Sequence, residues 1–94
     1  MSVVARRLVI RGRVQGVGYR DAAVQAAFEC AVTGWTRNRA DGSVEILVQG
    51  DKDLVERFVD WCRHGPPLAR VEGIVTVDVD VDAALRSFER WGTT

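Results

Sequence analysis

The pattern of apolar and polar residues divides the chain into short strands and two helices. Apolar residues at every second position, as at Leu8 and Ile10, predict strands, whereas apolar residues three or four positions apart predict helices. The expected strands cover residues 4–14, 32–38, 43–50, 71–82 and 85–91. The first expected helix covers residues 19–30, and the second lies between Asp51, a favourable N-cap residue, and Gly65, which stops it.

The order of these elements is β-α-β-β-α-β, followed by a short last strand. Two helices suffice to cover one face of such a sheet, so the other face stays open. We therefore predict an α+β fold, a ferredoxin-like βαββαβ sandwich with a four- to five-stranded antiparallel sheet and two helices on one face. A chain of 94 residues is long enough for one small domain, and we expect residues 1–94 to form it.

Charge is unevenly distributed along the chain, although the net charge is zero. Residues 1–39 contain seven arginines against Asp21 and Glu29, which gives +5, so residues 40–94 carry −5. Overall neutrality is unfavourable for a general nucleic-acid-binding protein. The basic first half favours a small anionic ligand.

Neither a signal peptide nor a stretch of transmembrane length is recognisable, which predicts a cytoplasmic protein that does not bind membranes. Cys30 and Cys62 are far apart in the sequence, and we expect two buried thiols rather than a disulfide or a metal pair. Residues 78–82 and Glu89 match the acidic spacing of a calcium loop, but Ala83 replaces its glycine. We interpret these aspartates as protection of an edge strand against aggregation.

The segment RGRVQGVGYRD connects the first strand to the first helix. Gly16 and Gly18 allow a tight turn there, and the amides of the following helix N-terminus favour an anion. The segment lacks the Lys-Ser/Thr pair of a P-loop, the third glycine of a dinucleotide site and the cysteine of a C-x₅-R phosphatase. The loop is therefore suited to hold a phosphate, without a nucleophile that could form a phosphoenzyme.

Three segments, GRVQGVGYR, GWTRNRADGSVE and HGPPLARV, occur in this order and together resemble the acylphosphatase family. The resemblance extends from Leu8 to Val71, and the last strand is compatible with it. It implies a ferredoxin-like fold and hydrolysis of acyl phosphates to carboxylate and inorganic phosphate, without metal or cofactor. The partners that it implies are a small-molecule acyl phosphate and, as competing anions, inorganic phosphate or sulfate, with no nucleic acid or membrane, for a monomeric protein.

The resemblance also implies the roles of individual residues. The anion cradle falls on Gln15, Gly16, Val17, Gly18, Tyr19 and Arg20. Arg20 corresponds to the phosphate-binding arginine and Asn38 to the asparagine that positions the attacking water. We expect the Tyr19 ring to pack on the core rather than take part in catalysis.

These residue types suit direct attack of water on phosphorus. A guanidinium can donate two parallel hydrogen bonds to phosphate oxygens, and an amide side chain can orient one water. No strong base is recognisable, so either a phosphate oxygen of the substrate takes the proton or the carboxylate leaves with little help from a base. The alternative is a binding module that holds an anion or a partner protein without turnover, but the presence of both Arg20 and Asn38 favours the enzyme.

Three residues depart from the family pattern or add to it. Ala31 stands where the family usually has glycine, which costs roughly 1 kcal/mol if that position requires a positive φ. Thr36 stands where an aliphatic residue is more usual. Arg39 is expected to add positive charge near Asn38.

Overall fold

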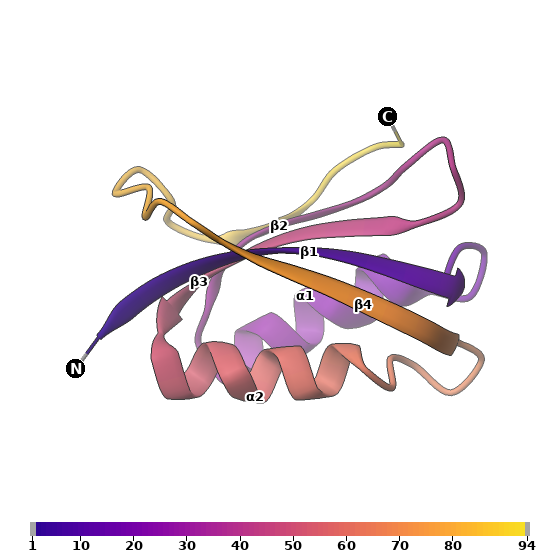
Figure 1. The fold of residues 1–94 in the computed structure, drawn as a ribbon, viewed down its shortest axis with the longest axis horizontal. Helices are drawn as coiled ribbons and strands as arrows, with labels where there is room; N and C mark the ends of the chain where they lie inside the picture. The colour runs from indigo at the N-terminus through magenta and orange to yellow at the C-terminus, as the bar shows by residue number, and fades with distance from the viewer. Residues whose placement is uncertain (1, 94) are drawn as a thin grey trace.

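The computed structural model describes residues 2–93, and it contains the predicted elements in the predicted order (Figure 1). The observed elements are β1 (Val3–Arg13), α1 (Tyr19–Cys30), β2 (Thr33–Asn38), β3 (Val44–Asp51), α2 (Lys52–Cys62), β4 (Arg70–Val79) and β5 (Phe88–Arg90). Both helices lie against the same face of the sheet, which confirms the ferredoxin-like α+β class.

The strands form one sheet in the order β4-β1-β3-β2-β5. The pairs β4-β1, β1-β3 and β3-β2 are antiparallel, as predicted. The last pair differs, because β5 runs parallel to β2, with Gly34 opposite Phe88 and Thr36 opposite Arg90. The chain reverses once after β4 and crosses to the opposite edge, so β5 takes the direction of β1 and β2. The sheet is therefore mixed.

The core lies between the sheet and the two helices. Its largest fully buried side chains include Tyr19, Phe58, Leu8, Ile10 and Ile46. Alternate residues of each strand point to opposite faces, so Leu8 and Ile10 face the helices while Arg7 and its alternates face the open side. The Thr36 hydroxyl is also buried in this layer and has no hydrogen-bond partner within residues 2–93.

The predicted ends of both helices are confirmed to within a few residues. Asp51 occupies the N-cap position of α2, although its side chain makes no capping hydrogen bond. Ala31 follows α1 in the left-handed conformation, with φ 57°. There the Val32 amide donates to the Ala27 carbonyl at 3.0 Å, which closes the last turn. No helix within the described residues has the length and apolar character needed to cross a membrane.

The cysteines occupy the predicted environments, whereas the acidic strand ends at Val79, so of its aspartates only Asp78 lies in the strand. Cys30 and Cys62 are both free and buried, and burial raises the pKa of the Cys62 thiol to about 12. β4 is an edge strand, and its Asp78 carboxylate lies 3.5 Å from the Arg6 guanidinium. Within residues 2–93, no three His, Cys, Asp or Glu side chains are grouped so that they could hold a metal ion.

The conformation of Ala31 leads to a prediction on stability. Ala31→Gly removes the steric strain that a Cβ causes in a left-handed residue. The free energy gained in this way exceeds the free-energy cost of the extra chain entropy that glycine gives the unfolded state. We expect the free energy of unfolding to rise by about 0.5–1 kcal/mol, as measured by urea denaturation. Ala22→Gly, inside α1, is the matched control and should lower it by about 1 kcal/mol. A loss of stability in both variants would contradict the assignment of strain to Ala31.

Candidate functional site

The turn between β1 and α1 is built from two glycines with left-handed backbone. Gly16 has φ 72° and Gly18 has φ 79°, values that L side chains rarely adopt. A Cβ added at either position would meet no other atom within 4 Å, so the requirement is on the backbone and not on space. Gly18 is the N-cap of α1 and offers no capping side chain. The first amides of the helix, which have no partner inside the helix, are thus left for another acceptor.

A cavity of about 210 Å³ lies at this helix start and joins the predicted residues from two parts of the chain. It is lined by Val14, Gly16, Gly18, Tyr19, Arg20, Asp21, Asn38 and Arg90. Asn38 is the last residue of β2 and is 8% exposed, on the side of the sheet that carries the helices. The structure therefore brings together the glycine turn, Arg20 and Asn38.

The Arg20 guanidinium is held by a neutral group. Its Nη1 donates a hydrogen bond of 2.9 Å to the backbone carbonyl of Trp91. Within the described part of the chain, Arg20 makes no ion pair, whereas its neighbour Asp21 lies 3.0 Å from the Arg90 guanidinium. Arg20 thus brings a positive charge to the cavity that no carboxylate neutralises, and it keeps further N–H donors for a ligand.

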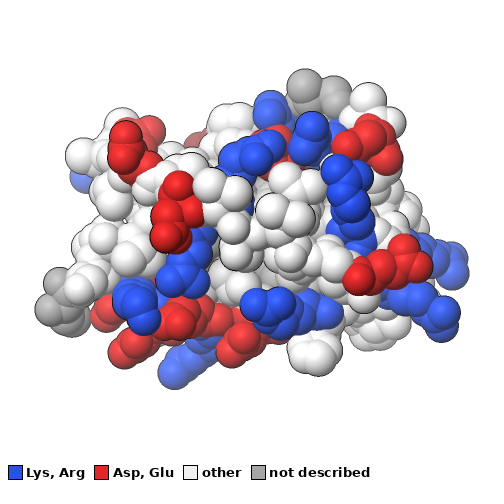
Figure 2. All heavy atoms as spheres, in the orientation of Figure 1, with Lys and Arg blue, Asp and Glu red and all other residues white. Residues whose placement is uncertain are grey.

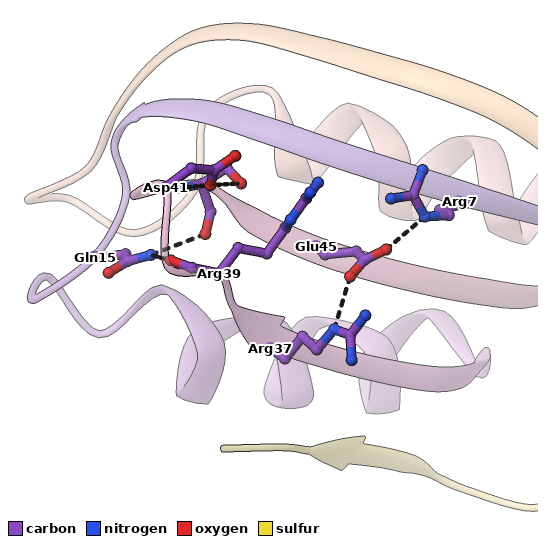
Figure 3. A network of polar contacts seen from close by, with 7 residues as sticks. Arg7, Gln15, Arg37, Arg39, Asp41 and Glu45 are labelled. Carbon is purple, nitrogen blue, oxygen red and sulfur yellow. Dashed lines mark hydrogen bonds and ion pairs between the residues drawn. The ribbon is translucent and has the colours of Figure 1, made fainter. Parts of the chain in front are cut away.

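The side chains of Gln15, Val17 and Tyr19 point away from the cavity or lie beneath it. Gln15 Nε2 donates to the carbonyls of Arg39 at 2.8 Å and Ser43 at 2.9 Å, which ties the turn to the β2–β3 loop (Figure 3). Val17 belongs to the core. The buried Tyr19 hydroxyl donates to the Cys62 carbonyl at 2.7 Å, which confirms its expected packing. These three residues can offer a ligand their backbone amides, while their side chains fix the turn.

Two charged residues of the cavity were not among the predicted site residues. Asp21 and Arg90 form an ion pair at its rim. The last strand was predicted, but its alternation alone does not reveal that it pairs with β2 beside Asn38. Only the parallel pairing of β5 with β2 brings Arg90 to the cavity, and no motif in the sequence predicts this pairing.

The expectation for Arg39 is corrected by the structure. Arg39 does not line the cavity of Asn38, because successive residues of a strand end point to opposite faces. Its side chain lies on the open face of the sheet, where it lines a second cavity with Arg7, Arg37 and Glu45 (Figure 3). There the two carboxylate oxygens of Glu45 accept hydrogen bonds from Nε of Arg7 and Nε of Arg37.

The structure is that of a small α+β protein with a cavity at a glycine turn, and comparison with known proteins identifies its family. The sequence profile of the acylphosphatase family matches residues 6–90. An acylphosphatase of Acidiphilium cryptum is 53% identical over 73 residues, which is 78% of this chain and 80% of that protein. An acylphosphatase of Azoarcus sp. is 53% identical over 77 residues, covering 82% and 79% of the two chains. The crystal structure of acylphosphatase from Bacillus subtilis superposes with a TM-score of 0.90 at 32% identity, covering 94% of this chain and 98% of that one.

The chain belongs to the acylphosphatase family, and its activity is that of an acylphosphatase. The resemblance seen in the sequence is confirmed, and so is the choice of an enzyme over a binding module. The substrate is therefore a small-molecule acyl phosphate.

The Glu45 carboxylate leads to a prediction on the pH dependence of stability. Burial alone would raise its pKa, but the hydrogen bonds from Arg37 and Arg7 outweigh burial and hold the pKa below its usual value. This stabilisation is present above the usual glutamate pKa and is lost as the pH falls through the lower pKa of the folded state. Glu45→Gln should therefore lower the free energy of unfolding near pH 7 by about 1 kcal/mol, because both arginines are partly solvated.

The difference between wild type and Glu45→Gln should shrink as the pH falls from about 5 to about 3, as followed by urea denaturation. Glu72→Gln, at an exposed position of β4, is the control and should show a small difference at every pH. A difference for Glu45→Gln that stays constant down to about pH 3 would contradict this assignment.

Proposed function

We propose that the cavity at the start of α1 binds the phosphoryl group of the acyl phosphate and that water attacks its phosphorus directly. The observation that carries this proposal is a single cavity lined by the glycine turn, Arg20 and Asn38. Phosphoryl transfer depends mainly on positioning and on stabilisation of charge, and these groups can supply both.

In this proposal the phosphate is held by Arg20 together with the backbone amides of Gln15, Gly16, Val17, Gly18, Tyr19 and Arg20. The positive φ values at both glycines support a turn whose amides converge on one point. The uncompensated guanidinium of Arg20 and the N-terminal end of the α1 dipole both favour a dianion there. Inorganic phosphate and sulfate should compete for the same donors.

Asn38 is proposed to orient the attacking water. Its amide group carries both an acceptor and two donors, so it can bind the water and contact a phosphate oxygen together. Its nearly complete burial restricts its rotamers, which keeps the water on one line of attack. The role belongs to Asn38 because it is the only amide side chain that lines the cavity within the described residues.

We propose that a phosphate oxygen of the substrate accepts the proton of the attacking water, or that the carboxylate leaves so readily that the attack needs little help from a base. Among the described residues, no histidine lines the cavity, and the one carboxylate that does, Asp21, is paired with Arg90. Burial raises the pKa of Tyr19 far above neutrality, and its hydroxyl is occupied by Cys62. Neither residue is suited to act as a general base.

We also propose that residues 1–94 act as one domain and as a monomer in the cytoplasm. The family profile spans most of the chain, which supports one domain. Two buried thiols without a disulfide are typical of a reducing compartment.

The roles of Arg20 and Asn38 can be separated by kinetics with benzoyl phosphate in the presence of a chelator. Arg20→Ala should lower kcat/KM by about 10²–10³-fold and weaken inhibition by inorganic phosphate, because a main phosphate ligand is lost. Asn38→Ala should lower kcat by about 10²-fold and leave phosphate inhibition nearly unchanged, because it acts on the water.

Arg57→Ala, at an exposed position of α2, is the matched control and should retain wild-type kinetics. Circular dichroism establishes that each variant is folded. Full activity of Arg20→Ala would refute the phosphate site, and equal loss of phosphate inhibition in both variants would make Asn38 a phosphate ligand instead.

The absence of an enzyme base leads to a separate prediction. The Asp21→Asn variant should retain kcat within about threefold of wild type, and kcat/KM should change with pH only where the substrate phosphate itself titrates. The measurement is a pH–rate profile of both proteins. An ionisation near neutrality that is present in the wild type and missing in Asp21→Asn would identify Asp21 as the base and overturn this proposal.

A further inference from the structure

The open face of the sheet carries a second cavity, separate from that of the acyl phosphate. It measures about 330 Å³ and is lined by Arg7, Arg37, Arg39, Ala40, Asp41 and Glu45, which we call the open-face cluster. None of these residues lines the cavity at the start of α1. The two cavities lie on opposite sides of the sheet, because Asn38 points to the helices while Arg37 and Arg39 point away from them.

Glu45 organises the arginines of the cluster. Its side chain is only 4% exposed, and it lies directly opposite Arg37 and diagonally from Arg7 across the strands. The Arg37 Nε donates to one carboxylate oxygen at 2.7 Å, and the Arg7 Nε donates to the other (Figure 3). Arg7 is bonded to Glu45 through Nε, so its two Nη groups remain for another acceptor.

The cluster has an excess of positive charge. Three arginines line the cavity against two carboxylates, Glu45 and Asp41, which leaves +1. Asp41 is mainly engaged within its own loop: hydrogen bonds from Ser43, with smaller contributions from the charges of Arg39 and Arg11, lower its pKa to about 2, and Arg11 lies 3.5 Å away. Within residues 2–93 no carboxylate pairs with Arg39, whose side chain extends across the same face as Arg7 (Figure 3).

We propose that the open-face cluster is a second anion site, which binds the phosphate group of a small molecule between Arg39 and Arg7. Guanidinium groups match phosphate oxygens in geometry, and two of them over one cavity can bind one phosphate from two sides. The site is independent of the acyl-phosphate chemistry proposed above. The phosphate can be the free ion or the terminal group of a phosphorylated metabolite.

The surroundings favour a small ligand over a nucleic acid. The chain has no net charge, and the carboxylates of Glu45 and Asp41 lie among the arginines of the cluster. Positive and negative side chains are also interspersed on the side of the molecule seen in Figure 2, where the sheet is viewed from its edge. A nucleic-acid surface needs a continuous basic stripe that follows the phosphate backbone. Arginines that surround one cavity are instead suited to bind a single phosphate group.

The proposal can be tested by NMR titration of the full chain with inorganic phosphate and, in a second series, with glucose 6-phosphate. We expect two sets of shifted signals, one from the amides of residues 16–20 and one from the Arg Nε groups of the open-face cluster. Arg39→Ala should weaken the second set by about tenfold and leave the first set unchanged. Arg20→Ala should do the reverse, so failure of one site is distinguished from failure of the other.

Arg57→Ala is the matched control, since it removes an exposed arginine from the helix side, and both sets of shifts should persist. Tighter binding of glucose 6-phosphate than of phosphate at the second set would support a metabolite, and the reverse order would support the free ion. Absence of shifts at the open-face cluster in the wild type, or identical affinity there in Arg39→Ala, would overturn the proposal. Tighter binding of a single-stranded oligonucleotide through the same side chains would overturn the assignment to a small ligand.

Discussion

The left-handed backbone at Gly16 and Gly18 is the constraint on which the site depends. These two residues turn the chain from β1 into α1 within a few residues, and no larger side chain adopts both φ values without strain. The turn fixes where α1 begins, and so where its unpaired amides and Arg20 lie. Because a Cβ would have room at both positions, substitution there would act through the backbone and not through a clash.

Hydrogen bonds from three side chains hold this turn in place, and each side chain bonds to a different part of the chain. Gln15 binds the β2–β3 loop, Tyr19 binds the end of α2, and Arg20 binds the carbonyl of Trp91. The contact of Tyr19 requires Gly65, since a Cβ there would lie 2.6 Å from the tyrosine ring. In a small domain with a modest core, these hydrogen bonds fix the turn, so that in the proposed mechanism the donors would need little reorganisation when phosphate binds.

The sequence predicted local features well and long-range neighbours less well. Alternation and helical spacing located all the elements. Ala31, noted as a departure from the family pattern that would be costly at a positive φ, does have a positive φ. The pairing of β5 with β2, which makes the predicted five-stranded sheet mixed, was not predicted, because periodicity reports which face a residue occupies and not which strand lies beside it. For the same reason Arg90 was missed at the cavity. The error on Arg39 was avoidable, since alternation already places it on the face opposite Asn38.

This alternation also determines the charge of the cavity at the start of α1. Arg37 and Arg39 flank Asn38 in the sequence, yet their charges lie on the other side of the sheet. Arg90 does reach the cavity, but Asp21 neutralises it. Among the residues that the structure describes, Arg20 is therefore the one cation of this cavity without a carboxylate partner. A cavity with several free cations would bind product phosphate as tightly as the transition state, and uniform binding of this kind does not raise kcat. In the mechanism that we propose, a single guanidinium, backbone amides and a neutral amide side chain would instead concentrate stabilisation on the charge and water geometry of the transition state, and the product could leave.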